Sequence, residues 1–259
     1  MAKTTCLSIF AGSASDIGRM RENNEDSYLV DNSRSLFIVS DGVGGHQAGA
    51  MASQIVVRVL PLMLEQRLAG AGNPPAKEIR RILCGAVKEL SWKINTESSD
   101  KAGLKGMGAT LVLALLRKRW VHIVHMGDSR AYLYREGQLV QLTMDHSIVG
   151  ILLRTGQIAQ EEACTHPAKG QLSRFVGMGG EAIPDLLTMG LKRGDRLLLC
   201  SDGLTGMLSD GQIGEILKAQ ADPQKACDNL IKAANRAGGK DNVTAVLVDF
   251  HGYRRPTSD

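Results

Sequence analysis

The chain of 259 residues is long enough to bury a substantial core, as one large domain or two small ones. Its content of 43% hydrophobic and 22% charged residues is typical of a globular protein. The net charge of +4, without a dense run of Lys and Arg, argues against nucleic-acid binding.

Cysteine usage and apolar runs bear on the cellular setting. The five cysteines are scattered and contain no CxxC pair, which argues against a disulfide framework or a zinc knuckle and favours a reducing, cytoplasmic setting. The first apolar run, at residues 6–10, is too short for a signal peptide. The longest, at residues 109–116, is far below the roughly 20 residues that span a bilayer, so we expect no membrane span.

Apolar runs of strand length recur along the whole chain. They predict strands at 6–10, 27–30, 36–39, 110–116, 120–125, 131–134, 139–142, 196–200 and 243–250. Neighbouring runs are joined by short turns such as Arg135-Glu136-Gly137-Gln138, which suits an antiparallel hairpin.

Three helical segments separate these strand clusters. One is predicted at 48–68, where we expect Pro61 to kink or divide it. The second covers about 75–95, and the third, 223–237, ends at Gly238-Gly239. Clustered hairpins with separate helices favour an α+β fold, and without a linker we expect one domain over 1–259. Residues of about 145–175 carry few strand signals and resemble an inserted flap.

Four aspartates share a context at strand edges beside glycines or polar turns: Asp41, Asp128, Asp202 and Asp241. The pair Glu25-Asp26 lies just before another strand. Each aspartate taken alone is most simply a turn residue. Asp41 and Asp202, however, both end strongly apolar strands, so they start from core positions. If these strand ends converge, mutual repulsion raises the carboxyl pKa values unless cations are bound. Carboxylate ligands suit Mg²⁺ or Mn²⁺ rather than zinc, and we expect Asp41 to face metal.

Other catalytic motifs are weaker in this chain. The glycine-rich loop 42–49 lacks the GxxxxGK[ST] pattern of a phosphate-binding P-loop, and no serine lies in a GxSxG elbow. His122 and His125 are three residues apart on a predicted strand, so they face opposite sides and cannot chelate one ion together.

Seven short segments occur in an order that is specific as a set. They are Arg21-Glu22-Asn23-Asn24-Glu25-Asp26-Ser27, Ser40-Asp41-Gly42-Val43-Gly44-Gly45-His46, Gly108-Ala109-Thr110, Met126-Gly127-Asp128-Ser129-Arg130, Asp145-His146-Ser147, Ser201-Asp202-Gly203-Leu204 and Asp241-Asn242-Val243-Thr244. With these segments the chain resembles, over about residues 9–250, the bacterial branch of the metal-dependent protein serine/threonine phosphatases of type 2C, the PPM family.

The resemblance implies a four-layer α-β-β-α sandwich of two antiparallel sheets with a metal centre at one end. It implies two core Mn²⁺ or Mg²⁺ ions and a weaker third. Asp41 would bridge the two ions with help from the Gly42 carbonyl, and Asp202 and Asp241 would hold the first ion. Asp128 would hold the third ion. Glu25 and Asp26 would support the cluster, partly through water.

The resemblance also implies a reaction. A metal-bridging hydroxide would attack the phosphorus of phosphoserine or phosphothreonine in line. Arg21 would bind the phosphate, and His46 would protonate the leaving group as general acid. Arg174 is a further candidate for substrate binding.

The expected function is a protein serine/threonine phosphatase that reverses a bacterial Ser/Thr kinase, with that kinase and its targets as partners. Two alternatives stay open from the sequence. One is a regulatory module without catalysis that binds a phosphoprotein or a metal. The other is a hydrolase of small phosphoesters.

Overall fold

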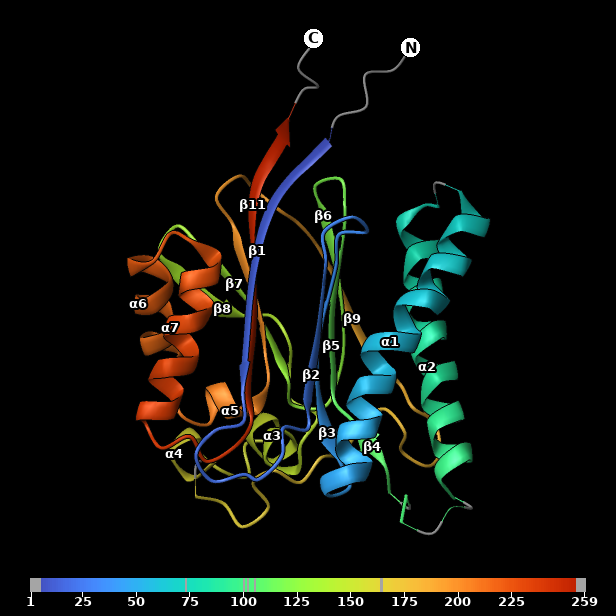
Figure 1. Cartoon of the computed structure of the whole chain (residues 1–259), viewed down its shortest axis with the longest axis vertical. Helices are drawn as coiled ribbons and strands as arrows, with labels where there is room; N and C mark the ends of the chain where they lie inside the picture. The colour runs from blue at the N-terminus through green and yellow to red at the C-terminus, as the bar shows by residue number, and fades with distance from the viewer. Residues whose placement is uncertain are drawn as a thin grey trace.

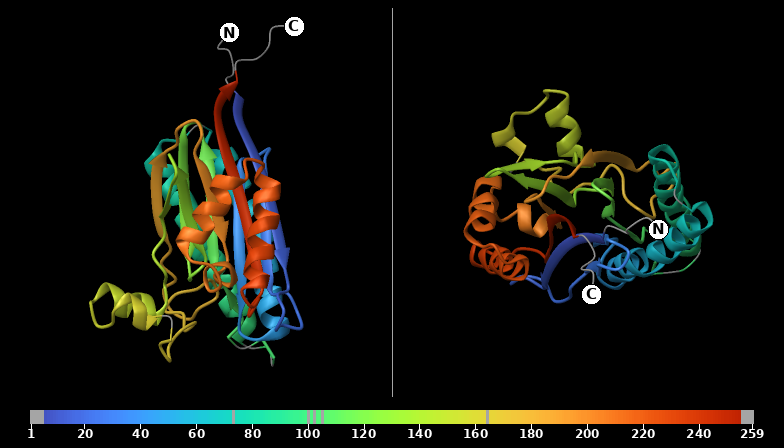
Figure 2. Two further views of the ribbon diagram at one scale, coloured as in Figure 1. Left: turned by 90° about the vertical axis from the view of Figure 1, so that its left-hand side faces the viewer. Right: turned by 90° about the horizontal axis from the view of Figure 1, so that it is seen from above.

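Two antiparallel sheets, packed face to face, form the centre of the computed structural model (Figures 1 and 2). The structure describes residues 6–72, 74–99, 101, 103–104, 106–163 and 165–254; within these, residues 6, 7, 46, 160, 253 and 254 are described by their backbone alone.

The first sheet has the order β1-β11-β10-β7-β8, and the second has the order β2-β3-β5-β6-β9, with β4 paired to β3. The first consists of β1 (Cys6–Asp16), β7 (Arg130–Arg135), β8 (Gln138–Gln141), β10 (Arg196–Cys200) and β11 (Val243–Arg254). The second consists of β2 (Asp26–Asp31), β3 (Leu36–Val43), β4 (Gly108–Ala109), β5 (Leu111–Arg117), β6 (Trp120–Met126) and β9 (Asp185–Gly190).

Helices cover the outer face of each sheet (Figure 1). The second sheet is covered by α1 (His46–Ala71) and α2 (Ala76–Ser99). The first is covered by α5 (Asp202–Thr205), α6 (Asp210–Ala219) and α7 (Pro223–Arg236). Two further helices, α3 (Ile148–Arg154) and α4 (Gln160–Ala163), project from one end of the sandwich (Figure 2).

Alternation along the central strands explains why their apolar runs are continuous. In β3, Leu36 and Ile38 face the helices α1 and α2, whereas Phe37 and Val39 face the other sheet. In β10, residues 197 and 199 face the opposite sheet and residues 198 and 200 face the outer helices. Both faces of these strands are therefore buried. The four-layer α+β sandwich expected from the resemblance is confirmed.

The strand predictions omitted β9. All six residues of Asp185–Gly190 are partly exposed, so the strand lacks the apolar alternation by which the others were recognised. The predicted β7–β8 hairpin is confirmed, and its turn has positive φ angles at Glu136 (52°) and Gly137 (81°), as a type I′ turn requires.

Of the two effects predicted for Pro61, a kink or a division of the helix, the division is wrong. Pro61 does not divide α1, which is a single helix from His46 to Ala71. Its neighbours Leu60 and Leu64 are buried in the core, and this packing holds the helix together where proline removes one backbone hydrogen bond. Helix α6 was not predicted, although the Ser209 and Gln212 side chains form a capping box that the sequence spacing S-x-x-Q could have revealed.

Helix α1 is also relevant to the expectation that no segment spans a membrane. By length and composition alone, Gln47–Ala71 could cross a bilayer. Its inward face, with Ala52, Val56 and Leu60 fully buried, packs against the second sheet. This is the packing of a core helix.

Candidate metal centre

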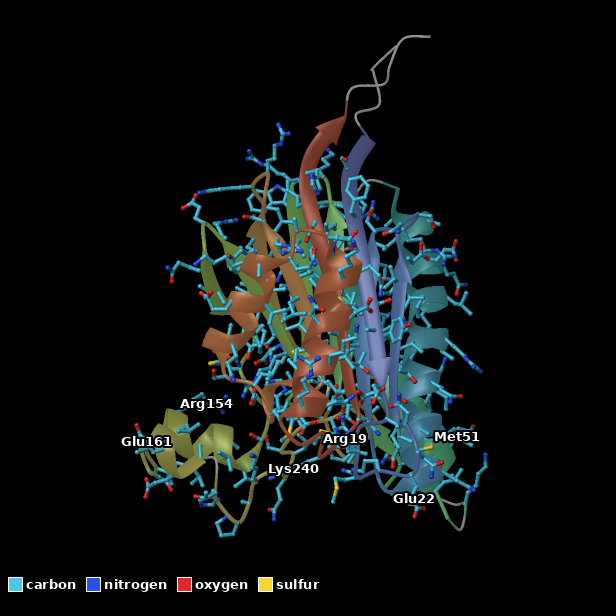
Figure 3. All side chains as sticks on the ribbon, turned by 60° about the vertical axis from the view of Figure 1, so that its left-hand side comes forward. Arg19, Glu22, Met51, Arg154, Glu161 and Lys240 are labelled. Atoms are coloured by element: carbon cyan, nitrogen blue, oxygen red, sulfur yellow. The ribbon has the colours of Figure 1, made fainter. Side chains whose placement is uncertain are left out.

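The acidic side chains singled out in the sequence come from strand ends and loops at one end of the sandwich. Asp26 and Asp41 are directly opposite each other in the β2–β3 ladder. Asp202 is the first residue of α5 after β10, Asp128 lies between β6 and β7, and Asp241 lies just before β11. Figure 3 labels Arg19, Glu22 and Lys240 at this end, beside the segments that carry these acids.

Ser201 joins the two sheets beneath the acids. Its hydroxyl donates a hydrogen bond to Asp26 Oδ2 (2.7 Å) and accepts one from the Thr244 amide (3.0 Å). Thr110 plays a similar part for Asp41, because its Oγ1 accepts from the Asp41 amide (2.9 Å) and contacts the Ser129 hydroxyl (2.6 Å). The Asp26 carboxylate and the Asp41 backbone amide are thus each held by a neighbouring hydroxyl.

Asn242 holds the loop that precedes β2, a role not foreseen from the sequence. Its Oδ1 accepts from the Glu25 amide (2.8 Å), and its Nδ2 donates to the carbonyls of Ile17 and Asn23 (both 2.9 Å). Asn242 is 3% exposed, so these bonds are shielded from water. Glu25 is thereby placed beside the strand end that carries Asp241.

Two glycines after Asp41 are required by close backbone approach. A Cβ atom on Gly42 would overlap the carbonyl group of Gly49, and a Cβ atom on Gly49 would overlap Glu25 Oε2. The glycine-rich stretch after the buried strand therefore lets the start of α1 close over the acids.

Burial and mutual repulsion dominate the electrostatics of this cluster. Burial, together with Asp202 and Asp241, raises the pKa of Asp26 to about 7, against the opposing hydrogen bond from Ser201. Burial and the charges of Asp26 and Asp202 raise the pKa of Asp41 well above its usual range. The pKa values of Asp128 and Asp202 are also raised, first by burial and then by neighbouring acids. The positively charged side chains near these aspartates therefore do not offset their burial and mutual repulsion.

Two carboxylate oxygens in this cluster have no hydrogen-bond partner within the described part of the chain. They are Asp26 Oδ1 and Asp202 Oδ1, and both are buried. A buried polar atom without a partner is costly, and an all-carboxylate donor set is what Mg²⁺ or Mn²⁺ takes. The residues present therefore fit divalent cations.

Arg21 lies over the acids. Its guanidinium donates to Asp241 Oδ2 at 2.7 Å, and this bond raises the pKa of Arg21 above its usual value. The side chain is 46% exposed, so it can also meet an incoming anion. His46 is the first residue of α1, next to Gly45, but its side chain is not among those the structure describes.

A second group of titratable side chains, which we name the histidine cluster, consists of His125, His146 and Asp185. Their potential ligand atoms lie within 4.8 Å of one another, and the two imidazole rings stack with centroids 4.5 Å apart. Strand alternation predicts that His122 and His125 face opposite sides, and His122 contacts the Thr188 hydroxyl (2.9 Å) instead. His146 and Asp185 lie 21 and 60 residues beyond His125, so no local pattern in the sequence connects the three residues.

Charges in the histidine cluster are balanced. Burial and the neighbouring His125 lower the pKa of His146 to about 4. Burial alone would raise the pKa of Asp185, but hydrogen bonds from Arg174 and His146 lower it to about 2. The candidate substrate residue Arg174 is thus paired with Asp185, its Nη1 lying 2.9 Å from Oδ1.

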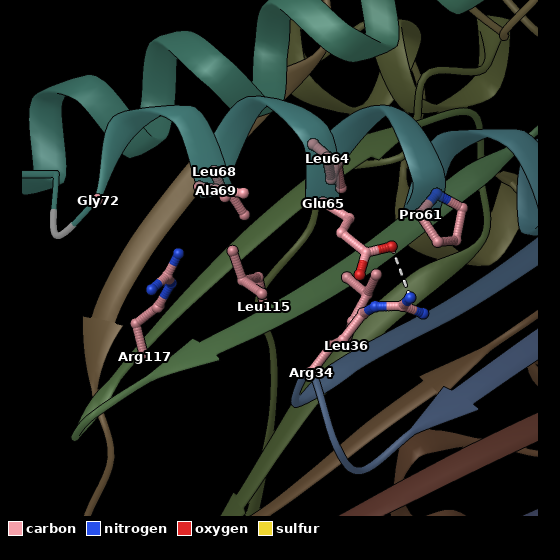
Figure 4. Close-up of a pocket in the computed structure, with 10 residues that line it drawn as sticks. All are labelled: Arg34, Leu36, Pro61, Leu64, Glu65, Leu68, Ala69, Gly72, Leu115 and Arg117. Atoms are coloured by element: carbon pink, nitrogen blue, oxygen red, sulfur yellow. Dashed lines mark hydrogen bonds and ion pairs between the residues drawn. The ribbon is translucent and has the colours of Figure 1, made fainter.

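A cleft of about 860 Å³ opens beside the acids, lined by Asp128 and Asp202 and by residues of α3, including Val149 and Leu153. Another cavity, of about 370 Å³, lies beside the C-terminal half of α1, where Leu64 and Leu115 line it and Arg34 pairs with Glu65 (Figure 4). None of the acids of the candidate metal centre lines this second cavity, whereas Asp128 and Asp202 line the first cleft.

Comparisons with known proteins agree with this geometry. The family model for protein phosphatase 2C matches residues 19–249. The serine/threonine phosphatase stp of Listeria monocytogenes is 40% identical over 237 residues, which cover 90% of this chain and 93% of that protein.

Two solved structures are also similar. The serine/threonine phosphatase of S. agalactiae has a TM-score of 0.85 at 34% identity, covering 94% of this chain and 100% of that one. The catalytic domain of the serine threonine protein phosphatase PstP, in complex with two manganese ions, has a TM-score of 0.75 at 34% identity, covering 94% and 99%. PstP is a protein of Mycobacterium tuberculosis. The chain therefore belongs to the protein phosphatase 2C family and is a metal-dependent protein serine/threonine phosphatase.

Proposed function

We propose that the acids at the open end of the sandwich hold two Mn²⁺ or Mg²⁺ ions and a weaker third. Asp41 would bridge the two core ions beside the Gly42 carbonyl, Asp202 and Asp241 would complete the first site, and Asp128 would hold the third ion. Glu25 and Asp26, each 8% exposed, would support the cluster from below. The observation that carries this proposal is the pair of buried carboxylate oxygens on Asp26 and Asp202, which have no hydrogen-bond partner among the residues that the structure describes.

Arg21 and His46 would then assist the reaction. When bound, the cations supply a water that is activated as a nucleophile near neutral pH. Arg21, partly exposed above Asp41 and Asp241, would grip the phosphoryl oxygens and orient phosphorus for in-line attack. His46 would donate the proton that the departing serine or threonine oxygen needs.

Removal and return of metal tests this assignment. We expect no phosphate release from a phosphothreonine peptide by protein stripped with EDTA, and recovery when Mn²⁺ is added. Titration calorimetry on the same stripped protein should detect two tight ions. Full turnover without metal would contradict the assignment. A comparison of the rates on the phosphothreonine peptide and on sugar phosphates separates the two kinds of enzyme. A protein phosphatase would prefer the peptide, whereas a small-phosphoester hydrolase would prefer the sugar phosphates.

We further propose that the substrates include a bacterial Ser/Thr kinase and the targets of that kinase, and that the enzyme works in the cytoplasm. Three described cysteines, Cys84, Cys200 and Cys227, are free thiols, which suits a reducing compartment. Residues of about 145–175, which carry α3 and α4, would act as a flap over the cleft that leads to Asp128 and Asp202. Incubation with the autophosphorylated cognate kinase, followed by phosphosite mass spectrometry, checks the first of these proposals.

A further inference from the structure

The histidine cluster connects the two ends of the flap segment, residues 145–175, which we call its entering and leaving stems, with the turn that carries Asp128. His146 belongs to the entering stem, and Arg174 to the leaving stem. The two stems are joined by the backbone, since the Ser173 amide donates to the His146 carbonyl (2.8 Å). Their side chains also meet on one carboxylate, because His146 Nε2 lies 3.1 Å from Asp185 Oδ2 and Arg174 Nη1 lies 2.9 Å from Asp185 Oδ1.

His146 binds both polar backbone groups of Gly127, the residue before Asp128. Its amide donates to the Gly127 carbonyl (2.9 Å), and its Nδ1 accepts from the Gly127 amide (3.3 Å). An amide can only donate, so Nδ1 carries no proton and the ring proton is on Nε2, facing Asp185. Both ring nitrogens of His146 are therefore engaged, which favours a hydrogen-bonded link over a further metal site.

Gly127 also packs closely against Thr110. It has a φ of +104°, and a Cβ atom there would lie 2.7 Å from Thr110 Cβ. Thr110 is the residue whose hydroxyl holds the Asp41 amide. The turn that presents Asp128 thus packs closely against Thr110, which bonds Asp41, and is hydrogen-bonded to His146 of the flap stem.

We propose that His146 is a positioning residue that links the flap stems, held on Asp185, to the Gly127–Asp128 turn and so sets the affinity of Asp128 for a divalent cation. This inference rests on the proposed assignment of the weaker ion to Asp128. His146 is 1% exposed and need not touch the ion or the substrate to act in this way.

Two substitutions separate the two bonds of the ring. His146→Asn keeps an oxygen near the place of Nδ1, where it can accept from the Gly127 amide, but is too short to reach Asp185. His146→Gln keeps an N–H near the place of Nε2 and loses the acceptor for Gly127. The readout is Mn²⁺ binding to metal-free protein, followed by calorimetry and by the electron paramagnetic resonance of free Mn²⁺.

We expect His146→Gln to raise the dissociation constant of the weakest ion about tenfold, the value of one lost hydrogen bond, with the two tight ions within twofold of wild type. We expect His146→Asn to raise the dissociation constant of the weakest ion about threefold, because it keeps the bond to the Gly127 amide and loses only the bond to Asp185. Faster hydrogen exchange of the Gly127 amide in His146→Gln, but not in His146→Asn, would accompany this.

Equal behaviour of the two variants, or equal loss of tight and weak ions, would overturn the proposal. Loss of a further ion in both His146 variants that is retained in Asp128→Asn would also overturn it, since the cluster would then itself bind metal. Asp128→Asn is the control for the underlying assignment. If it keeps all three ions, the assignment fails, whereas loss of the third ion in Asp128→Asn with no change in His146→Gln refutes only the positioning role.

If His146→Gln does not fold, Asp185→Ala replaces it, because the Asp185 side chain is 38% exposed and tolerates truncation better. It removes the carboxylate that the His146 ring shares with Arg174 of the leaving stem, and we expect a rise of about threefold in the dissociation constant of the weakest ion. A value unchanged from wild type would refute the link.

Discussion

Two groups of ionisable side chains lie near the same end of this phosphatase, and they differ in how their charges are compensated. In the acidic cluster, burial and like charges raise the pKa values of Asp26 and Asp41, and two carboxylate oxygens have no hydrogen-bond partner in the described part of the chain. In the histidine cluster, burial and the neighbouring His125 lower the pKa of His146, whereas hydrogen bonds from Arg174 and His146 lower the pKa of Asp185. Both ring nitrogens of His146 are hydrogen-bonded. The first arrangement is incomplete without cations, whereas the second is complete in the protein itself.

The largest expected effect comes from a substitution in the acidic cluster. Asp41→Asn removes the proposed bridging carboxylate, and we expect kcat on a phosphothreonine peptide to fall by at least about 10³-fold. The metal-free variant should melt no lower than wild type, because one repelling charge is gone. Retained turnover together with retained Mn²⁺ binding would contradict the role of Asp41.

The next expected effect concerns the leaving group. His46→Ala should slow hydrolysis of a phosphothreonine peptide by about 10²-fold, because an alkoxide must be protonated as it departs. An activated aryl phosphate needs no such proton, so its hydrolysis should change little. Mn²⁺ affinity serves as the control, and equal losses on both substrates would argue against the acid role.

Arg21 tests how charge at the rim of the acidic cluster is used. Arg21→Ala should lower kcat/KM about 10–100-fold, with Arg21→Lys intermediate, because lysine cannot grip phosphate in a bidentate way. The Arg21–Asp241 ion pair is 46% and 33% exposed, so its contribution to stability is small and Tm should hardly move. A large fall in Tm with unchanged KM would indicate a structural role instead.

The stability of the metal-free protein should depend on pH through the acidic cluster. The pKa of Asp26 is about 7 in the fold and near 3.8 when unfolded, so the folded metal-free protein binds the extra proton. Its contribution to metal-free stability is therefore lost as pH rises from about 4 to about 7. Mn²⁺ requires the ionised acids, and we expect the Mn²⁺-induced rise in Tm to grow from pH 6 to pH 8. Asp41→Asn is the control, and a rise that shrinks with pH would contradict this account.

The contribution of the histidine cluster to stability should change with pH in the opposite direction. The pKa of His146 is about 4 in the fold and 6.5 when unfolded, so the unfolded chain takes up the proton first. Metal-free stability should fall as pH drops from 6.5 towards 4, and this fall should be smaller in His146→Asn, by a few degrees of Tm. His125, whose pKa burial also lowers, contributes a remainder in both proteins. Identical pH slopes would refute a neutral, buried His146.

Local signals in the sequence were sufficient for most of the fold. Strands with continuous apolar residues, such as 36–39 and 196–200, were recognised because the four layers bury both of their faces. Strand β9 was not, because it is an edge strand whose residues are all partly exposed. The uninterrupted path of α1 through Pro61 was missed for a different reason, since packing against the sheet outweighs the local cost of proline.

The sequence by itself determined which acids end buried strands, the order of the motifs, and with it the family and the expected layers. Only the tertiary structure decided what these residues meet. Asn242 reaches Glu25 across 217 residues, and His125, His146 and Asp185 come together from three separate segments. The physical reason is that strand-end signals are local, whereas hydrogen bonds and electrostatic fields depend on distances in space that the packing of the two sheets sets.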